Sequence, residues 1–338
     1  MKRSDISVVM SVYNDVRHVE AAVKSILCQT YADFEFLVID DASVDGTYKL
    51  LTKSSWSRDP RLRVIRNETR QGLTRNLNRI IALSHGKFIA RQDSDDESLP
   101  YRFEIELSAL HQSPDIVAVG SHMEIIGRQK RVPGKPVPTN PVQLRQMIPF
   151  YNPLIHGSVM IRRSALEELA RRENRRMGDD FPYREGAGYS EDYDLWLRLV
   201  ELGELANVSE ILYRYRLNYR GVSSSRCVLQ SRYCRLVQAL ASERVKRGSD
   251  RLQRGERVEL PNLTREESAA ILCQQAYKFT AYGLLSKAIL WHLKAIATYP
   301  PILYSIVAIA LGPFVPGPLR RWVQEVKSWF VSFNKLRL

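Results

Sequence analysis

The 338-residue chain is poor in cysteine, the residue whose disulfides or zinc sites stabilise small proteins that lack a large hydrophobic core. Its four cysteines (Cys28, Cys227, Cys234 and Cys273) show no CxxC pair and no Cys/His ligand spacing, so they indicate neither a disulfide framework nor a structural zinc site. With 17 Gly, 16 Pro and 44% hydrophobic residues, the chain is not collagen-like or disordered throughout. We therefore expect an ordinary globular protein in a reducing, cytoplasmic setting.

Two sequence signals are also missing. The apolar run from Ile6 to Val12 is interrupted at Tyr13-Asn14-Asp15, so it does not resemble a cleaved secretory leader. Residues 8–20 contain no glycine, and no GxxxxGK[ST] or GxGxxG motif follows an expected strand. The second absence argues against one alternative function, a nucleotidyltransferase that acts on sugar phosphates.

The formal net charge of +13 is unevenly distributed. Residues 1–226 hold 33 basic and 30 acidic residues, whereas residues 227–338 hold 17 basic and 7 acidic ones. We expect the C-terminal third to meet something anionic. The chain lacks a zinc-finger or RNA-binding signature, so an anionic membrane surface is a simpler partner for it than nucleic acid.

The first 120 residues alternate between short apolar runs and stretches of helical periodicity. Such alternation is typical of α/β proteins with a mostly parallel sheet and right-handed crossovers. The helices are expected around Val23, Tyr48 and Leu77. The four expected strands are Ile6–Val12, Phe34–Ile39, Arg61–Arg66 and Phe88–Arg91.

Polar residues follow each of these strands. Parallel sheets bind ligands at the carboxyl ends of their strands, so these residues are expected to line one polar crevice. They are Ser11, Tyr13 and Asn14 at the end of the first strand, Asp40 and Asp41 at the end of the second, Arg66 and Asn67 at the end of the third, and Asp93 and Asp95 at the end of the fourth.

The pattern is looser from residue 121 to 150, where Arg128–Pro138 is expected to be a loop rich in basic residues and proline. Further strands are expected at His156–Ile161 and Ile211–Tyr215. The remaining expected elements are helices, at Arg163–Arg172, Glu191–Val200, Arg226–Arg247 and Glu266–Ala297.

Residues 299–316 are the most apolar stretch. Eleven residues separate Pro301 from Pro313, fewer than the ~20 that a membrane-spanning helix needs. Flanking aromatic and basic residues suit a segment lying in a bilayer interface. A buried helix that packs on the preceding pair explains the pattern equally well, and both interpretations stay open.

Several of the crevice residues could carry chemistry. Carboxylates in an Asp-x-Asp pattern such as Asp93-Ser94-Asp95 are suitable ligands for Mg²⁺ or Mn²⁺, although acidic loops are often only solvated. Asp41 could accept hydrogen bonds from a nucleobase or ribose, and Arg75 could bind phosphate oxygens. Asp192 could be a general base or could merely cap the helix that starts there.

Six segments in this order resemble the family 2 glycosyltransferases of GT-A fold. The resemblance covers about residues 5–220 and implies a catalytic domain at residues 1–226, followed by a helical C-terminal region at 227–338. The segments are residues 6–14 (ISVVMSVYN), 38–47 (VIDDASVDGT), 66–74 (RNETRQGLT), 90–100 (ARQDSDDESLP), 156–160 (HGSVM) and 190–196 (SEDYDLW).

The resemblance implies a role for each matching position. Asp93 and Asp95 would form the metal-binding pair, with Asp95 the more direct ligand, and Asp192 would be the catalytic base. His156, Glu191 and Trp196 would lie on the acceptor or diphosphate side. The nucleotide-sugar donor would be bound by Ser11, Tyr13, Asn14, Asp40, Asp41, Arg75 and Asp93.

The implied reaction is inverting transfer of a sugar from a nucleotide diphosphate sugar to a hydroxyl group of a glycan or lipid-linked acceptor. A divalent metal, Mn²⁺ or Mg²⁺, would be the cofactor. Cell-surface or exopolysaccharide biosynthesis at the inner face of the plasma membrane is the expected setting. A transferase-like binding module without turnover remains the second alternative.

Overall fold

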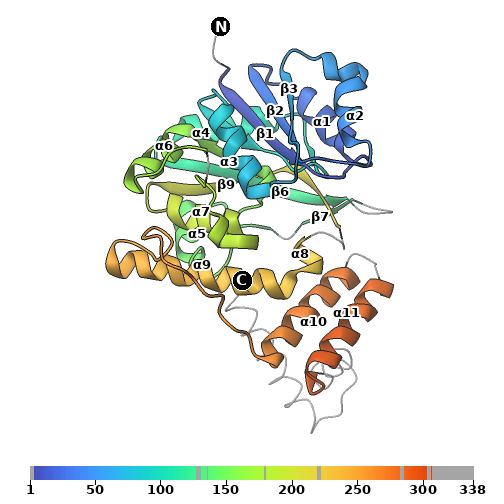
Figure 1. The fold of residues 1–338 in the computed structure, drawn as a ribbon, viewed down its shortest axis with the longest axis vertical. Coiled ribbons are helices and arrows are strands. Elements are labelled where there is room, and N and C mark those ends of the chain that lie inside the picture. The colour runs from blue at the N-terminus through green and yellow to red at the C-terminus, as the bar shows by residue number, and fades with distance from the viewer. Residues whose placement is uncertain are drawn as a thin grey trace. The chain divides into compact units, whose positions relative to one another are not determined.

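The computed structural model describes residues 4–126, 131–134, 136–178, 180–218, 222–281, 285–302 and 306 (Figure 1). The chain divides into two compact units. The first comprises residues Met1–Leu217 and Leu240–Glu256, and the second comprises Asn218–Ala239 and Arg257–Leu338.

Four parallel strands form the N-terminal part of the first unit, as the sequence predicted. They are β1 (Ile6–Val12), β2 (Phe34–Asp40), β3 (Leu62–Arg66) and β4 (Phe88–Arg91), in the order β3-β2-β1-β4. The connecting helices are α1 (Val19–Leu27), α2 (Thr47–Lys53) and α3 (Leu73–Leu83), with a short 3₁₀ helix η1 (Ser55–Arg58) before β3. The predicted α/β class is confirmed.

Helices cover both faces of this sheet. Val8, Met10 and Val12 of β1 pack in one core with α1 and with α4 (Arg102–Gln112). On the other face, Asn76 of α3 donates a hydrogen bond to the hydroxyl of Ser11 at 3.0 Å. Alternate residues of a strand point to opposite faces, so α1 and α3 lie on opposite sides of β1 (Figure 1). Full burial of each Val or Ile contributes roughly 1.5–3 kcal/mol.

The sheet continues beyond β4 through strands of mixed direction, in the order β4-β8-β6-β9-β5. The pairs β4–β8, β6–β8 and β5–β9 are antiparallel, whereas β6 and β9 are parallel. The bounds are β5 (Glu97–Ser98), β6 (Ile116–Ile126), β7 (Arg131–Pro133), β8 (Met160–Arg162) and β9 (Glu204–Arg216).

Three predictions in this region are corrected. Residues 121–126 belong to β6, an 11-residue strand, although Ser121, His122 and Glu124 break its apolar pattern. Within the expected loop at Arg128–Pro138, β7 pairs with β6, while residues 127–130 and 135 lie outside the described part of the chain. The expected strand at His156–Ile161 begins as the 3₁₀ helix η2 (His156–Ser158).

The carboxyl ends of β1, β2 and β3 meet at one edge of the sheet. The parallel register places Val12, Asp40 and Arg66 side by side. The backbone continues this pairing, because the N–H of Asp41 donates to the carbonyl of Val12 and the N–H of Asn67 donates to that of Asp40. The polar residues after these strands therefore lie close together.

Two further helices of the first unit, α6 (Arg163–Arg172) and α7 (Glu191–Leu199), follow the prediction closely, and a 3₁₀ segment η3 (Glu185–Ser190) precedes α7. Helix α5 (Pro141–Met147) was not predicted. After β9 come α8 (Val222–Ser225) and α9 (Cys227–Arg247), and α9 contributes residues to both units.

The second unit contains a pair of helices where the sequence predicted one helical range, Glu266–Ala297. These are α10 (Arg265–Ala281) and α11 (Leu285–Thr298), which pack through small buried residues such as Ala276 and Ala288.

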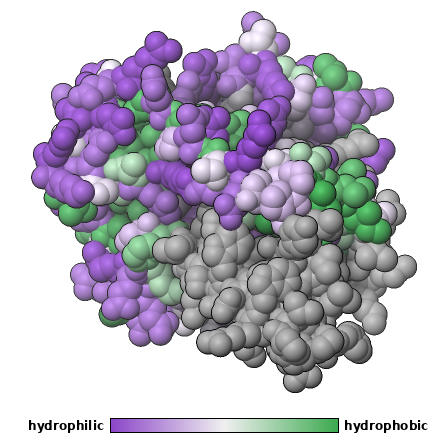
Figure 2. All heavy atoms as spheres, turned by 90° about the horizontal axis from the view of Figure 1, so that it is seen from below, coloured by the Kyte–Doolittle hydropathy of each residue, from purple (hydrophilic) through white to green (hydrophobic). Residues whose placement is uncertain are grey.

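Of the apolar stretch 299–316, only 299–302 and 306 lie within the described residues. Across the described chain, no helix combines the length and apolarity needed to cross a bilayer. Figure 2 shows one face, on which hydrophilic side chains predominate and apolar ones lie in small groups between them.

Candidate active site

The ends of β1, β2 and β3 are joined by a cluster of polar side chains, Ser11, Asp41, Asn67 and Asn76, which we call the strand-end cluster. Asp41 is 2% exposed, and its carboxylate accepts hydrogen bonds from the Asn67 side chain and from the N–H groups of Gln71 and Gly72 at 2.8–2.9 Å. Burial raises the pKa of Asp41, but these donors outweigh it and leave the pKa below its usual value. Asp41 thus holds the loop that precedes α3.

Asp40 and Asn14 fasten the neighbouring loop. Asp40 is fully buried, accepts a hydrogen bond from the N–H of Ser43 at 3.2 Å and lies 3.5 Å from Nε of Arg66. Asn14 has a φ of 50°, a conformation that asparagine tolerates better than most residues. Its side-chain oxygen accepts from the N–H of Val44, and its own N–H donates to the Ser43 hydroxyl, both at 2.9 Å. These contacts make the loops at the ends of β1 and β2 one structure.

Tyr13 lies at the rim of this region and is 40% exposed. The guanidinium of Arg70 lies over the Tyr13 ring, 4.1 Å from its centre. The guanidinium of Arg66 lies 4.3 Å from the centre of the Tyr48 ring in the same way. Each guanidinium is a flat cation stacked on an aromatic ring. The two pairs form an exposed surface that is suited to binding a planar ring by stacking or an anionic group by charge attraction.

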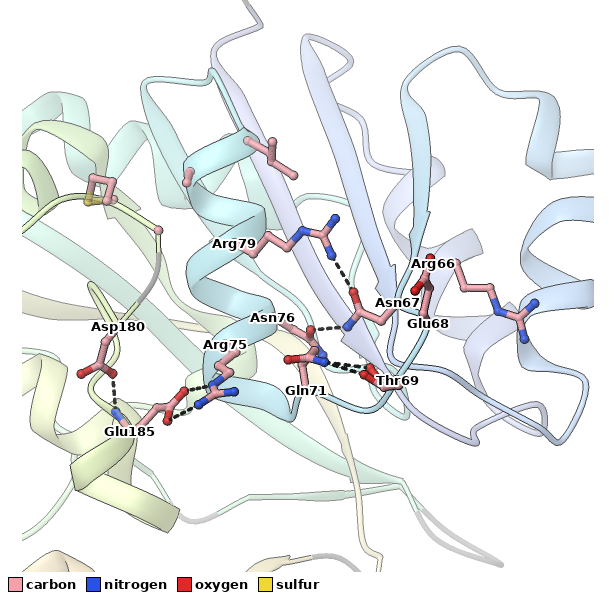
Figure 3. A pocket seen from close by; sticks show the side chains of 14 residues that line it. Arg66, Asn67, Glu68, Thr69, Gln71, Arg75, Asn76, Arg79, Asp180 and Glu185 are labelled. Atoms are coloured by element: carbon pink, nitrogen blue, oxygen red, sulfur yellow. Dashed lines mark hydrogen bonds and ion pairs between the residues drawn. The ribbon is translucent and has the colours of Figure 1, made fainter.

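Arg75 faces a cavity of about 1040 Å³ beside α3 (Figure 3). Its guanidinium forms a two-pronged ion pair with Glu185, one bond of which measures 3.1 Å. Asn67 and Asn76 also line the cavity, which therefore borders the strand-end cluster. Neither Asp93 nor Asp192 is among the lining residues.

The acidic residues after β4 differ in their surroundings. Asp93 and Asp95 are partly exposed, and the Asp93 carboxylate lies 2.7 Å from Nη2 of Arg91. Asp96 is 1% exposed and accepts a hydrogen bond from the N–H of Arg216 at 2.6 Å. Burial, together with the charges of Asp93 and Asp95, raises the pKa of Asp96 well above its usual value. The described residues contain no group of three or more His, Cys, Asp or Glu placed to hold a metal ion.

Arg91 is a functional candidate that the sequence reasoning missed. It is 1% exposed, and Nε and Nη1 of its guanidinium have no hydrogen-bond partner among the described residues. The available signal was an arginine at the end of a run expected to be a buried strand. Such a buried cation indicates that negative charge must lie nearby.

That negative charge comes from two directions. Asp93 lies two residues after Arg91, just beyond the end of β4, while Glu191 and Asp192 begin α7. Burial raises the pKa of both Glu191 and Asp192, and the charge of Arg91 opposes this rise at each of them. We call Arg91, Asp93, His156, Glu191 and Asp192 the Arg91 cluster.

His156 lies in the same cluster. Its Nε2 is 2.8 Å from the hydroxyl oxygen of Tyr183, a buried residue. Burial, and next the charge of Arg91, lower the pKa of His156 well below its usual value, so its imidazole is neutral at pH 7. Trp196 is fully buried and meets the His156 ring edge-on, with ring centres 6.0 Å apart. Trp196 therefore supports His156 and does not present its ring to the surface.

Both oxygens of the Asp192 carboxylate are hydrogen-bonded. Oδ2 accepts from the side-chain amide of Asn152 at 2.8 Å, and Oδ1 accepts from the N–H of Tyr193 at 2.7 Å. Burial raises the pKa of Asp192 above its usual value despite these donors. A carboxylate with a raised pKa is a stronger base, and so a better proton acceptor, than a carboxylate with the usual pKa.

Helix α7 is held by a buried ionic network. Asp194 is fully buried and accepts hydrogen bonds from Arg184 and Arg198. Burial opposes ionisation of Asp194, yet the two guanidinium groups lower its pKa below the usual range. Arg184 also pairs with Asp250 at 3.0 Å. This network fixes the position of the helix that begins with Glu191 and Asp192.

The structure thus brings most of the predicted site residues into two neighbouring groups, and Arg75 belongs to neither of them. The strand-end cluster contains Ser11 and Asp41, with Asn14 and Asp40 in the adjoining loop, and the Arg91 cluster contains Asp93, His156, Glu191 and Asp192. Val9 of β1 pairs with Arg91, and the Ser94 hydroxyl donates to Asp15 at 2.8 Å, which joins the ends of β1 and β4. Arg75 is paired with Glu185 instead.

Two sequence relatives illustrate the similarity of this chain to known proteins. It is 33% identical to the putative glycosyltransferase EpsE of Bacillus subtilis over 221 residues, which is 62% of this chain and 72% of that protein. It is 29% identical over 230 residues to the UDP-Glc:alpha-D-GlcNAc-diphosphoundecaprenol beta-1,3-glucosyltransferase WfgD of Escherichia coli, covering 65% of this chain and 80% of that protein.

Solved structures share the fold at low identity. The mannosyltransferase PcManGT of Pyrobaculum calidifontis, solved with GDP-Man and Mn²⁺, aligns over 99% of this chain and 87% of its own, with a TM-score of 0.55 and 17% identity. TarS of S. aureus aligns with a TM-score of 0.54 and 16% identity, over 98% of this chain but only 54% of the TarS chain.

The family model called Glycosyl transferase family 2 matches residues 7–170, the range that contains the strand-end cluster, Arg91, Asp93 and His156. The relatives of 29% and 33% identity extend the similarity over more than 60% of the chain. On these grounds the chain belongs to glycosyl transferase family 2.

Proposed function

We propose that this chain is an inverting glycosyltransferase of GT-A fold that moves a sugar from a nucleotide diphosphate sugar to a hydroxyl acceptor. The observation that carries the proposal is the Arg91 cluster. The cluster contains Asp93, which would lie on the donor side, and Glu191 and Asp192, which would lie on the acceptor side, near one buried cation. Inverting transfer needs a base for the acceptor hydroxyl and a means of neutralising the leaving diphosphate, and these carboxylates could serve both needs.

The nucleotide part of the donor would bind at the strand-end cluster and its loop. Ser11, Asn14, Asp40 and Asp41 organise that edge, and the Tyr13–Arg70 stack provides an aromatic and cationic rim. Arg75 would have to exchange Glu185 for a phosphate oxygen to contact the donor. That exchange is feasible because the Arg75 side chain is 57% exposed.

The residues after β4 fit a divalent cation. Mg²⁺ and Mn²⁺ commonly take one or two protein carboxylates and complete their shell with phosphate oxygens, and Asp93 and Asp95 supply such a pair. Burial, and next the charges of Asp93 and Asp95, raise the pKa of the neighbouring Asp96, which is consistent with several carboxylates lying close together there. Asp95 and Asp93 would hold the ion, which would neutralise charge on the diphosphate leaving group.

Asp192 would act as the general base. The acceptor hydroxyl gives its proton to the Asp192 carboxylate while its oxygen attacks the anomeric carbon. The bond from that carbon to the diphosphate oxygen breaks, and the nucleoside diphosphate leaves with the electron pair. One displacement inverts the configuration at this carbon and forms no covalent sugar–enzyme species. Glu191 and His156 would border the acceptor or the diphosphate, supported by the buried Trp196.

A lipid-linked or glycan acceptor in cell-surface or exopolysaccharide biosynthesis suits the chain. The E. coli relative carries an undecaprenol-linked acceptor in its name. Residues 227–338 hold 17 basic and 7 acidic residues, which favours a peripheral position at the anionic inner face of the plasma membrane. Residues 1–226 would form the catalytic domain, and residues 227–338 a helical C-terminal region.

The proposal predicts slow hydrolysis of one UDP- or GDP-sugar by the purified protein with Mn²⁺ or Mg²⁺, measured as nucleotide release across a donor panel. Asp192→Asn should abolish release while leaving donor binding nearly intact, because the amide cannot accept the proton. Glu104→Gln, which changes an exposed carboxylate on α4, is the matched control and should stay active.

Two results would contradict this proposal. A folded protein that binds a nucleotide but releases none from any donor would be a binding module without turnover. Full activity in Asp192→Asn would place the base elsewhere.

A further inference from the structure

The carboxylate of Asp192 is held from outside its own helix by one neutral side chain. The amide of Asn152, 40 residues earlier in the sequence, donates to Oδ2 at 2.8 Å. The contact to Oδ1 comes from the next residue of α7 itself, Tyr193. Each carboxylate oxygen accepts about two hydrogen bonds, so both keep capacity for a further proton donor.

The orientation of the Asn152 amide is set by its own loop. The Asn152 side-chain oxygen accepts from the N–H of Leu154 at 3.2 Å, which leaves the NH₂ group facing Asp192. Asn207, buried on β9, donates to the carbonyl of Pro153 at 3.2 Å and to that of Pro138 at 2.8 Å. Segment 152–154 is therefore fastened to the central sheet, and Asn152 extends this rigid support to Asp192.

Several charged or titratable groups act on the same carboxylate. Glu191 lies beside Asp192 on α7, Arg91 comes from β4, and Tyr183 comes from the segment before η3. Asp93 at the end of β4 acts on Glu191 and so contributes indirectly. Asn152 differs from all of these because its side chain neither carries a charge nor titrates. Its removal changes the hydrogen bonding of Asp192 while leaving the charge of the site the same.

We propose that Asn152 is a positioning residue for Asp192, orienting its carboxylate toward the acceptor and stabilising its ionised form. Asn152 acts through Asp192 and does not touch the reacting atoms. This inference rests on the proposed function, in which Asp192 is the base. It adds that the base is set in place by the segment between α5 and η2, which no sequence motif connected with α7.

The first test measures the pH dependence of nucleotide release from the donor that the panel identifies. A donor that bonds a carboxylate stabilises the charged form, so Asn152→Ala raises the pKa of Asp192. The acidic limb of kcat should move to higher pH by about 1–2 units, with the KM for the donor unchanged. Asn152→Asp, which keeps the shape but adds a second carboxylate, should move the limb at least as far.

Asn140→Ala is the matched control for these variants. Asn140 caps the start of α5 by accepting from the N–H of Val142, and it makes no contact with the Arg91 cluster among the described hydrogen bonds. Its loss should leave the acidic limb in place. A limb that stays in place in both Asn152 variants, or that shifts equally in Asn140→Ala, would overturn the role of Asn152.

The second test needs no enzymatic activity. The full chain is labelled with ¹³C at the aspartate carboxyl carbons, and the resonance lost in Asp192→Asn identifies Asp192. Its midpoint should rise in Asn152→Ala and Asn152→Asp and stay unchanged in Asn140→Ala. An unchanged midpoint in either folded Asn152 variant contradicts the proposal. Because this titration does not depend on turnover, it judges Asn152 even if Asp192→Asn keeps full activity and the proposed function fails.

Discussion

Arg91 shows how one buried side chain can hold together a site whose other members are negative. A guanidinium that is 1% exposed with two unpartnered N–H groups is costly unless opposite charge surrounds it. Asp93 supplies that charge at 2.7 Å, and Glu191 and Asp192 add to it from α7. Gly157 belongs to the same arrangement, because a Cβ there would lie 2.7 Å from Oδ2 of Asp93. The close packing leaves no room for a side chain at that position.

The charge of Arg91 should be detectable at His156. A nearby cation disfavours imidazolium, so Arg91→Met is expected to raise the pKa of His156, although burial keeps it below the usual value. The measurement is an NMR titration of the imidazole nitrogens. Arg75→Met, which removes an exposed guanidinium paired with Glu185, should leave the titration of His156 unchanged. An identical His156 midpoint in wild type and Arg91→Met would show that the two groups do not interact.

At the scale of elements, α7 is fixed more by ionic contacts than by its caps. Ser190 at its N-cap makes no side-chain capping hydrogen bond. Instead Asp194, one turn into the helix, is enclosed by Arg184 and Arg198. Arg184 continues to Asp250, which Arg244 also contacts at 2.5 Å. The start of α7, with Glu191 and Asp192, is thereby held against the segment that precedes η3.

Asp194→Asn should destabilise the protein strongly, because it removes the buried carboxylate that Arg184 and Arg198 share and leaves them only Asp250 and Glu173, respectively. Breaking such a pair costs about 3–5 kcal/mol, which calorimetry or chemical denaturation would reveal. Glu168→Gln, which loses exposed ion pairs with Arg171 and Arg172 on α6, should leave the midpoint unchanged. Equal midpoints for the two variants would contradict the assigned role of Asp194.

The same network has a defined pH dependence. The pKa of Asp194 is lower in the folded state than its ordinary value of 3.8. Its contribution to stability is therefore complete above that value and is lost as the pH falls through the lower folded pKa. The stability difference between wild type and Asp194→Asn should accordingly shrink in strong acid.

At the scale of the whole molecule, net positive charge is concentrated toward the C-terminus, where exposed apolar side chains are also present. Residues 227–338 hold most of the net positive charge. Helix α11 exposes Ile289, Leu290 and Leu293, each about half exposed. Basic residues together with exposed apolar side chains favour binding to an anionic lipid surface.

Deletion of residues 299–338, which removes the apolar stretch 299–316 together with five basic residues and one acidic residue, should weaken membrane association. We expect the full chain to sediment with vesicles containing anionic phosphatidylglycerol and the shortened chain to stay in the supernatant. Vesicles of neutral phosphatidylcholine, and added salt, serve as controls, because the electrostatic part of the binding is screened. Equal sedimentation of the two proteins would favour the alternative in which residues 299–316 form a buried helix.

Much of the first unit could be predicted from local sequence. The runs Ile6–Val12 and Phe88–Arg91 became β1 and β4 with the predicted bounds, and Arg163–Arg172 became α6. Strand β6 was not predicted in full because Ser121, His122 and Glu124 interrupt its apolar pattern. Its extent depends on pairing with the neighbouring strands, which local sequence does not reveal. The range Glu266–Ala297 was predicted as one helix because both α10 and α11 have helical composition and no proline separates them.

The sequence by itself determined the α/β class, the acidic residues that end β2 and follow β4, and the acidic start of α7. These features depend on periodicity and on neighbours a few residues apart, which a linear reading contains. Only the tertiary structure decided that Arg91 would meet Glu191 and Asp192, that Asn152 would hold Asp192, and that Arg75 would pair with Glu185. These pairs are 40 to 110 residues apart, so their meeting depends on how the whole sheet stacks its strands and helices.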